Sequence, residues 1–146
     1  MVLVGKTGSG KSAAGNTILR RESFESEVSP ASVTKECRIH EVMSGEKTIS
    51  VTDTPGVYYT EFDEKALRRV LERFIYMTAP GPHVFLLVIS LGVRYSKEEK
   101  DAVQWICDHF GREALQYTIV LFTHTDELKN KTLEQYVNKS SELKKL

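Results

Sequence analysis

Segment Gly5–Ser12 has the residue types and spacing of a phosphate-binding loop, G-x-x-x-x-G-K-[ST]. Its glycines let the backbone wrap closely around a phosphate, and the N-terminus of the helix that follows adds partial positive charge. In such loops the lysine, here Lys11, reaches the β- and γ-phosphates, and the next hydroxyl, here Ser12, ligates Mg²⁺. The alternative is a glycine-rich turn that only caps a helix. The expected ligand contacts are Gly5, Lys6, Thr7, Gly8, Ser9, Gly10, Lys11, Ser12 and Ala13.

The sequence D-T-P-G at residues 53–56 supplies further groups for the same ligand. A carboxylate at Asp53, after an alternating strand, can hold Mg²⁺ through water, and the backbone N–H of Gly56 can approach the γ-phosphate. A D-x-x-G tetrad occurs often by chance, and the alternative interpretation of this one is a simple Pro-Gly turn. Its position downstream of a phosphate loop favours a role in binding the metal and the phosphates. Val57 stands where many small G proteins have a glutamine that orients water. Hydrolysis should therefore be slow, unless another residue supplies that group.

A long polar segment, Arg21–Lys35, separates the first helix from the next strand. Loops of this length in small domains are usually functional or disordered. Thr34 is the best candidate in it to close over Mg²⁺ and the γ-phosphate, through its hydroxyl and its backbone. A solvated loop threonine is the alternative, and three serines compete for the role: Ser26, Ser29 and Ser32.

The sequence T-H-T-D at residues 123–126 is the candidate for reading a base. The Asp126 carboxylate can accept hydrogen bonds from N1–H and the N2 amine of guanine, which adenine lacks, so it would discriminate strongly. The usual guanine signature is N-K-x-D; here Thr123 replaces the asparagine and His124 the lysine. Two roles are open to His124, stacking on the base or bridging to the phosphate loop. The alternative for Asp126 is a helix N-cap or a turn.

The elements that must position these groups alternate between strand and helix. Continuous apolar runs predict buried strands at Met1–Val4, Val84–Ile89 and Thr118–Phe122. Alternating patterns predict a hairpin of Cys37–Met43 and Lys47–Thr52, turning at Ser44-Gly45-Glu46. Helical spacing marks Lys11–Arg20, Glu64–Met77, Lys97–Phe110 with Gly111 as its C-terminal cap, and Leu133–Leu146. The pattern predicts an α/β fold: a mostly parallel sheet, helices on both faces and one antiparallel edge hairpin. Ligands in such sheets bind beyond the carboxyl ends of the strands.

The composition excludes several classes of protein. The 146 residues carry 20 Lys and Arg against 20 Asp and Glu, which argues against nucleic-acid binding by bulk charge. No apolar run is long enough to span a membrane, and no signal peptide is recognisable. Cys37 and Cys107 give neither a disulfide framework nor metal spacing, so we expect core cysteines in a reducing, cytoplasmic compartment. Trp105 is expected to be a partly buried packing residue, and Glu98–Lys100 a solvated face.

Taken together, four segments resemble the G domain of the immunity-associated nucleotide-binding GTPases, the GIMAP family. They are V-L-V-G-K-T-G-S-G-K-S-A-A-G-N-T-I-L (2–19), S-V-T-K-E-C (32–37), V-T-D-T-P-G-V (51–57) and the stretch from P-G-P-H to K-D-A-V (80–103). The resemblance covers essentially the whole chain. It implies a P-loop NTPase G domain, and it makes T-H-T-D one of the family's usual variants of the guanine motif.

The resemblance also implies roles for two further residues. Thr34 matches the family's Mg²⁺-loop threonine. Members pair through their nucleotide faces, and Arg94 in L-G-V-R-Y-S aligns with an arginine that can act in trans as a catalytic finger, which suits a chain with Val57. Val93 is an insertion relative to the family's L-G-R, and an ordinary surface arginine is the alternative for Arg94. A homodimer or oligomer is therefore expected.

The expected function is a Mg²⁺-dependent switch that binds GTP and GDP, with slow or dimer-activated hydrolysis. The alternative is a nucleotide-gated assembly scaffold with negligible hydrolysis; a P-loop kinase is a weaker option, because no acceptor site is evident. Residues 1–146 are expected to form one incomplete G domain. Both ends look cut, and the sixth strand and closing helix that G domains need have no counterpart after Asp126.

Overall fold

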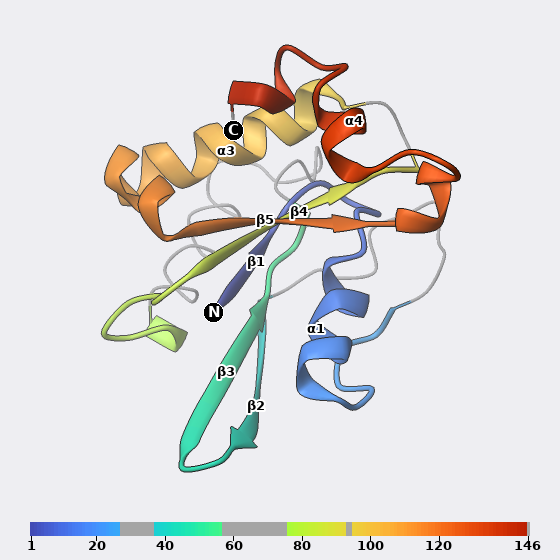
Figure 1. Ribbon diagram of the computed structural model, residues 1–146. Helices are drawn as coiled ribbons and strands as arrows, with labels where there is room; N and C mark the ends of the chain where they lie inside the picture. Colours follow the sequence, from blue (N-terminus) through green and yellow to red (C-terminus); the bar gives the residue numbers. More distant parts are fainter. Residues whose placement is uncertain (27–36, 57–75, 93–94, 146) are drawn as a thin grey trace.

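The computed structural model describes residues 1–26, 37–56, 76–92 and 95–145, and in them the chain builds one five-stranded sheet (Figure 1). Along the sheet the strand order is β2-β3-β1-β4-β5. β1 is parallel to both β3 and β4, β4 is parallel to β5, and β2 is antiparallel to β3. The bounds are β1 Val2–Val4, β2 Arg38–Ser44, β3 Lys47–Asp53, β4 Phe85–Ser90 and β5 Thr118–Thr123. The expected α/β fold with an antiparallel edge hairpin is confirmed.

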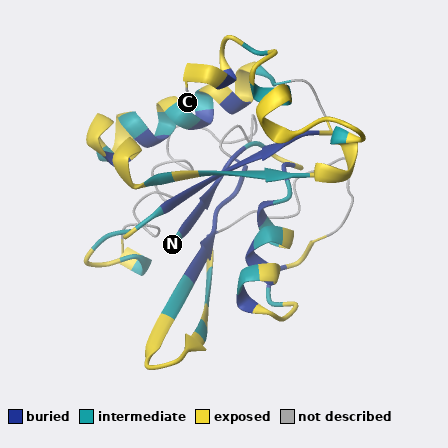
Figure 2. Cartoon of the chain, in the orientation of Figure 1, coloured by how far each residue is buried: buried dark blue, intermediate teal, exposed yellow. Residues whose placement is uncertain are grey.

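The central strands are buried on both faces, as their unbroken apolar runs predicted. Side chains alternate across a strand, so Val2 and Val4 of β1 pack in one core cluster and Leu3 packs in the other. β4 divides in the same way between the two clusters and is buried along its whole length. Figure 2 shows these strands in dark blue, whereas the tip of the β2–β3 hairpin is exposed. This alternation gives each face of the sheet its own hydrophobic core.

Helices cover both faces of the sheet (Figure 1). Helix α1, Lys11–Leu19, packs Leu19 into one cluster together with Phe24. Helix α3, Lys97–Phe110, packs Ala102 and Ile106 into the other. The shorter helical elements are η1 Arg112–Tyr117, η2 Thr125–Leu128, α4 Leu133–Val137 and η3 Leu143–Lys145. None of the helices within the described ranges is long and apolar enough to cross a membrane.

Helix α3 has the bounds that its sequence predicted. Glu99 accepts a hydrogen bond from the backbone N–H of Ser96, 2.8 Å away, which satisfies one of the donors left over at a helix start. The chain leaves the helix at Gly111, whose φ of 80° favours glycine. Trp105 packs partly buried against the adjacent core, and Cys37 is a buried core residue, both as expected.

The prediction of one continuous helix over residues 133–146 is wrong. Helix α4 ends at Val137, and the next helical turn, η3, begins at Leu143. The Ser140 hydroxyl accepts a hydrogen bond from the backbone N–H of Leu143, so it starts a new turn instead of continuing the old one. Most of the predicted helix over residues 64–77 lies outside the described residues.

Candidate functional site

The phosphate-loop motif connects β1 to α1 at the carboxyl end of the central strand. Gly10 has a φ of 91°, a conformation that glycine adopts readily. A Cβ at Gly5 would lie 2.5 Å from the carbonyl oxygen of Val88 on β4, so only glycine fits there. The loop therefore lies tightly against the end of the sheet, as a cradle for phosphate requires.

Lys11 is a buried cation at the base of this loop. Its side chain is 6% exposed and its Nζ donates to the carbonyl oxygen of Lys6, 2.8 Å away. Burial lowers the pKa of Lys11 to about 8, and the nearby Asp53 carboxylate opposes that shift only in part. A phosphate beside Nζ would favour the charged form, so the loop fits an anionic ligand.

Two of the three expected metal ligands, Ser12 and Asp53, lie in direct contact. The Ser12 hydroxyl, at the start of α1, donates to Oδ2 of Asp53, at the end of β3, over 2.6 Å. Mg²⁺ is usually held by one or two carboxylates together with phosphates and water rather than by an all-protein cage. One hydroxyl and one buried carboxylate beside a phosphate loop suit that coordination.

The D-T-P-G segment packs against the phosphate loop at its last residue. A Cβ at Gly56 would lie 2.1 Å from the Thr7 hydroxyl oxygen and 2.7 Å from the Thr7 backbone nitrogen. The glycine is therefore required by close approach, and its backbone lies beside the loop that is expected to hold the phosphates. The structure brings these two predicted site residues together.

The base-reading segment is tied to the phosphate loop by Thr123. Its hydroxyl donates to the carbonyl oxygen of Ser9 over 2.7 Å. His124 has a φ of 55°, and its Nδ1 lies 3.1 Å from the Ser90 hydroxyl and 3.2 Å from that of Thr123. A bridge to the phosphate loop was one of the two roles predicted for His124; the structure shows that contact at Thr123, for which it was not predicted.

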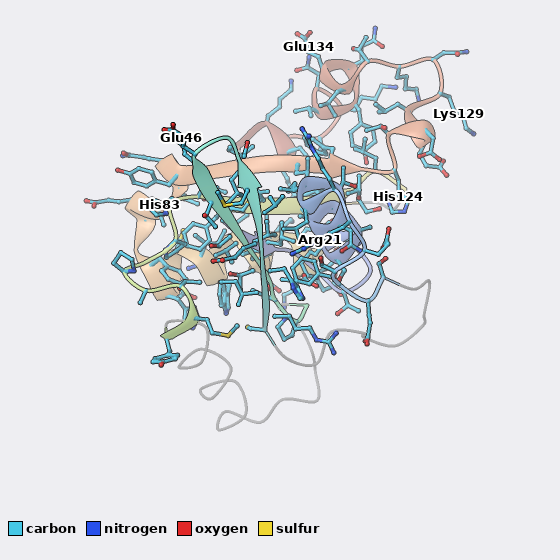
Figure 3. The ribbon with its side chains drawn as sticks, turned by 90° about the horizontal axis from the view of Figure 1, so that it is seen from below. Arg21, Glu46, His83, His124, Lys129 and Glu134 are labelled. Atoms are coloured by element: carbon cyan, nitrogen blue, oxygen red, sulfur yellow. The ribbon has the colours of Figure 1, made fainter. Side chains whose placement is uncertain are left out.

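Asp126 follows in η2 and is exposed beside the same end of the sheet. Figure 3 shows His124 at the opposite end of the molecule from His83, because His83 precedes β4 and His124 follows the parallel strand β5. Thus the phosphate loop, Asp53, Gly56 and the T-H-T-D segment share one edge of the sheet. Thr34, Val57 and Arg94 lie outside the described residues, so the roles predicted for them stay predictions.

The expectation that residues 98–100 form a solvated face is wrong at its central residue. Glu98 and Lys100 are exposed, but Glu99 is fully buried, and its Oε1 lies 3.6 Å from Nζ of Lys6 in the phosphate loop. The sequence carried two signals of this. Ser96 and Glu99 have capping-box spacing, and Glu99 shares the buried helical face of Ala102 and Ile106.

The topology and the loop define a P-loop nucleotide-binding domain, and the comparisons with known proteins identify its family. The chain matches the AIG1 family over residues 1–146 and belongs to it. It is 37% identical to immune-associated nucleotide-binding protein 3 of Arabidopsis thaliana over 93% of this chain and 42% of that protein. It is 33% identical to human GTPase IMAP family member 8 over 100% of this chain and 22% of that protein. The chain thus spans less than half the length of these relatives, and the expected resemblance is confirmed.

Solved structures of chloroplast Toc33 from Arabidopsis thaliana have the same fold. The structure with Mg²⁺ and GMPPNP aligns at a TM-score of 0.71 and 26% identity, and that with GDP and Mg²⁺ at 0.70 and 27%. Each covers 99% of this chain and 57% of the Toc33 chain. The G domain of the FeoB iron transporter from T. maritima, at 16% identity and a TM-score of 0.59, shares the fold alone. The P-loop G-domain class predicted from the sequence is confirmed.

Proposed function

We propose that this chain is a cytoplasmic, Mg²⁺-dependent switch protein that binds GTP and GDP. The observation that carries the proposal is the Ser12–Asp53 hydrogen bond beside the buried Lys11, because a hydroxyl, a carboxylate and a cation at the glycine-rich loop suit Mg²⁺ and phosphate. The Mg²⁺ complexes of the Toc33 relatives with GDP and GMPPNP support the choice of ligand. The Asp126 carboxylate, after β5, is suited to select guanine.

Each group of the site has a distinct task in this proposal. The loop N–H groups and Lys11 bind the phosphates. Ser12 and Asp53 would hold Mg²⁺, which would neutralise part of the negative charge of the phosphates. Thr123 holds the base-reading segment against the phosphate loop. This contact fixes the distance between the base site and the phosphate site. Thr34 closes over the metal and the γ-phosphate. None of these residues orients the attacking water, since Val57 stands where many small G proteins have a glutamine for that role.

Base selection by Asp126 is tested by changing the base instead of removing the side chain. Asp126→Asn presents a donor where guanine also donates, so we expect at least about tenfold weaker GDP binding and tighter binding of xanthosine diphosphate. Isothermal titration with GDP, ADP and xanthosine diphosphate measures the change, and Glu127→Gln, exposed at the next position, is the control. Unchanged base preference in Asp126→Asn, or equal affinity of the unaltered chain for ADP, would contradict the guanine assignment.

Hydrolysis that depends on pairing is the second part of the proposal. Val57 does not orient water, and Arg94 is the residue we assign to complete the site of a second copy. Dimerisation is important for the GTPase activity of the chloroplast translocon components atToc33 and psToc159, which supports this assignment. We expect turnover per molecule to rise with protein concentration and Arg94→Ala to abolish the rise.

The alternative function is an assembly scaffold whose output is the oligomer itself, with negligible hydrolysis. The same concentration series separates the two, with light scattering recorded in GDP and in GMPPNP. Arg21→Ala, an exposed arginine on the loop after α1, is the control variant. A GMPPNP-dependent oligomer with flat turnover per molecule would favour the scaffold and exclude dimer-activated hydrolysis.

A further inference from the structure

The phosphate loop contains a second lysine, Lys6, whose side chain turns to helix α3. Its Nζ lies 3.6 Å from Oε1 of Glu99, and the two side chains are 17% and 0% exposed. Its carbonyl oxygen, on the backbone, accepts the hydrogen bond from Nζ of Lys11. Lys6 therefore joins the phosphate-binding lysine to a buried carboxylate on another element.

The two carboxylate oxygens of Glu99 contact two different parts of the fold, the start of α3 and the phosphate loop. Oε2 accepts hydrogen bonds from the Ser96 backbone N–H at 2.8 Å and from the Ser96 hydroxyl at 3.4 Å, which fixes the start of α3. Oε1 is buried and accepts no hydrogen bond within the described ranges, so Lys6 is the cation beside it there. A carboxylate that is taken fully out of water needs such a charge partner.

The stretch between β4 and α3 extends this link to the base-reading segment. The backbone N–H of Leu91 donates to the carbonyl oxygen of Thr123 over 3.0 Å. A Cβ on Gly92 would lie 3.7 Å from side-chain atoms of both His124 and Glu127. The chain that leaves β4 thus touches the base-reading segment first and, at Glu99, the phosphate loop.

We propose that Glu99 is a positioning residue for the nucleotide site: through its ion pair with Lys6 it fixes the phosphate loop to the start of α3. This inference rests on the proposed nucleotide binding. In this proposal the ammonium group of Lys6 pairs with Glu99, and Lys11 is the lysine that binds the phosphates.

The test is a double-mutant cycle on the two partners. Glu99→Gln retains an oxygen for Ser96 but removes the charge, and Lys6→Met removes the other partner. We expect each to weaken GDP binding about tenfold, within the usual range of coupling between sites, and the double variant to lose no more than either one. Lys6→Arg restores the cation and should recover most of the affinity. Dissociation of a fluorescent GDP from the full chain is the first readout, and thermal unfolding without nucleotide is the second.

Two control variants separate positioning from stability. Ser96→Ala removes a helix-cap hydroxyl without touching Lys6, so it should lower the unfolding temperature and leave GDP dissociation unchanged. Glu98→Gln, exposed on the same helical turn, should change GDP dissociation less than twofold. Because Glu99→Gln removes a buried charge, it can fail to fold; Lys6→Met against Lys6→Arg then decides the question alone.

The inference is overturned if Glu99→Gln and Lys6→Met lower the unfolding temperature but keep GDP dissociation within twofold of the unaltered chain. Additive losses in the double variant overturn it as well. If the unaltered chain binds no guanine nucleotide, the proposed function fails instead, and amide exchange of residues 6–9 becomes the readout. Faster exchange in Glu99→Gln but not in Ser96→Ala then supports the positioning role, and equal exchange excludes it.

Discussion

Lys11 lowers the stability of the nucleotide-free protein but provides a cation that suits a phosphate site. Its ammonium is buried, and burial lowers its pKa from 10.5 to about 8. The unfolded chain therefore binds more protons than the folded one between these two pH values, and stability rises with pH across that window. Below about pH 8 the folded protein carries the full unfavourable contribution of this charge. A site that holds a phosphate has a use for such a cation, which an ordinary core does not.

Lys11→Met is accordingly expected to stabilise the nucleotide-free protein while abolishing nucleotide binding. The free energy of unfolding at pH 7 should rise by up to about 3 kcal/mol, which is the pKa shift expressed as energy. The gain should fade between pH 8 and 10.5, as the unaltered protein loses the charge. Urea unfolding without nucleotide at pH 7 and pH 10 measures both effects, with the exposed Lys47→Met as control. An unchanged or lower unfolding free energy at pH 7 would contradict the argument.

At the scale of elements, local chemistry decided which helix bounds were predictable. Helix α3 carries its own signals at both ends, Ser96 before it and Gly111 after it, and its bounds were predicted to the residue. Helix α4 has a similar start at Thr132, with a side chain that accepts from the backbone of Gln135. Its end at Val137 has no such signal in the apolar pattern, and the next helical turn starts only where the Ser140 hydroxyl accepts a hydrogen bond from the backbone N–H of Leu143.

The sheet was predictable for a different reason. Runs such as β4, buried from Phe85 to Ser90, are long enough to identify without knowledge of their neighbours. The β2–β3 hairpin was marked by alternation and by Gly45, whose φ of 62° fits the tight turn that joins Ser44 to Lys47. Parallel pairing then places the carboxyl ends of β1, β3, β4 and β5, and so the motifs that follow these strands, at one edge of the sheet.

At the scale of the whole molecule, the site was predictable wherever a motif follows a strand. Ser12 and Asp53 meet because β1 and β3 are parallel neighbours. The Lys6–Glu99 pair was not predicted from the sequence, because the two residues come from a loop and a helix far apart in the sequence. No sequence motif contains both of them. Charged residues on a helix are usually solvated, so the burial of Glu99 can be predicted only from its capping-box spacing to Ser96 and from the helical face that it shares with Ala102 and Ile106.

Because the site joins the phosphate loop, β3 and β5, ligand binding should stabilise the molecule as a unit. A ligand that binds only the folded chain adds about 2.7 kcal/mol at a hundred times its dissociation constant, which for this length corresponds to roughly 5–10 °C in the unfolding temperature. We expect GDP with Mg²⁺ to produce that rise, excess EDTA to remove much of it, and Lys11→Met to show none. ADP with Mg²⁺ is the matched control, since it offers the same phosphates without the guanine edge that Asp126 is proposed to read. An equal rise with ADP would mean that the phosphates alone are recognised, and no rise with either nucleotide would contradict a nucleotide site built from these three elements.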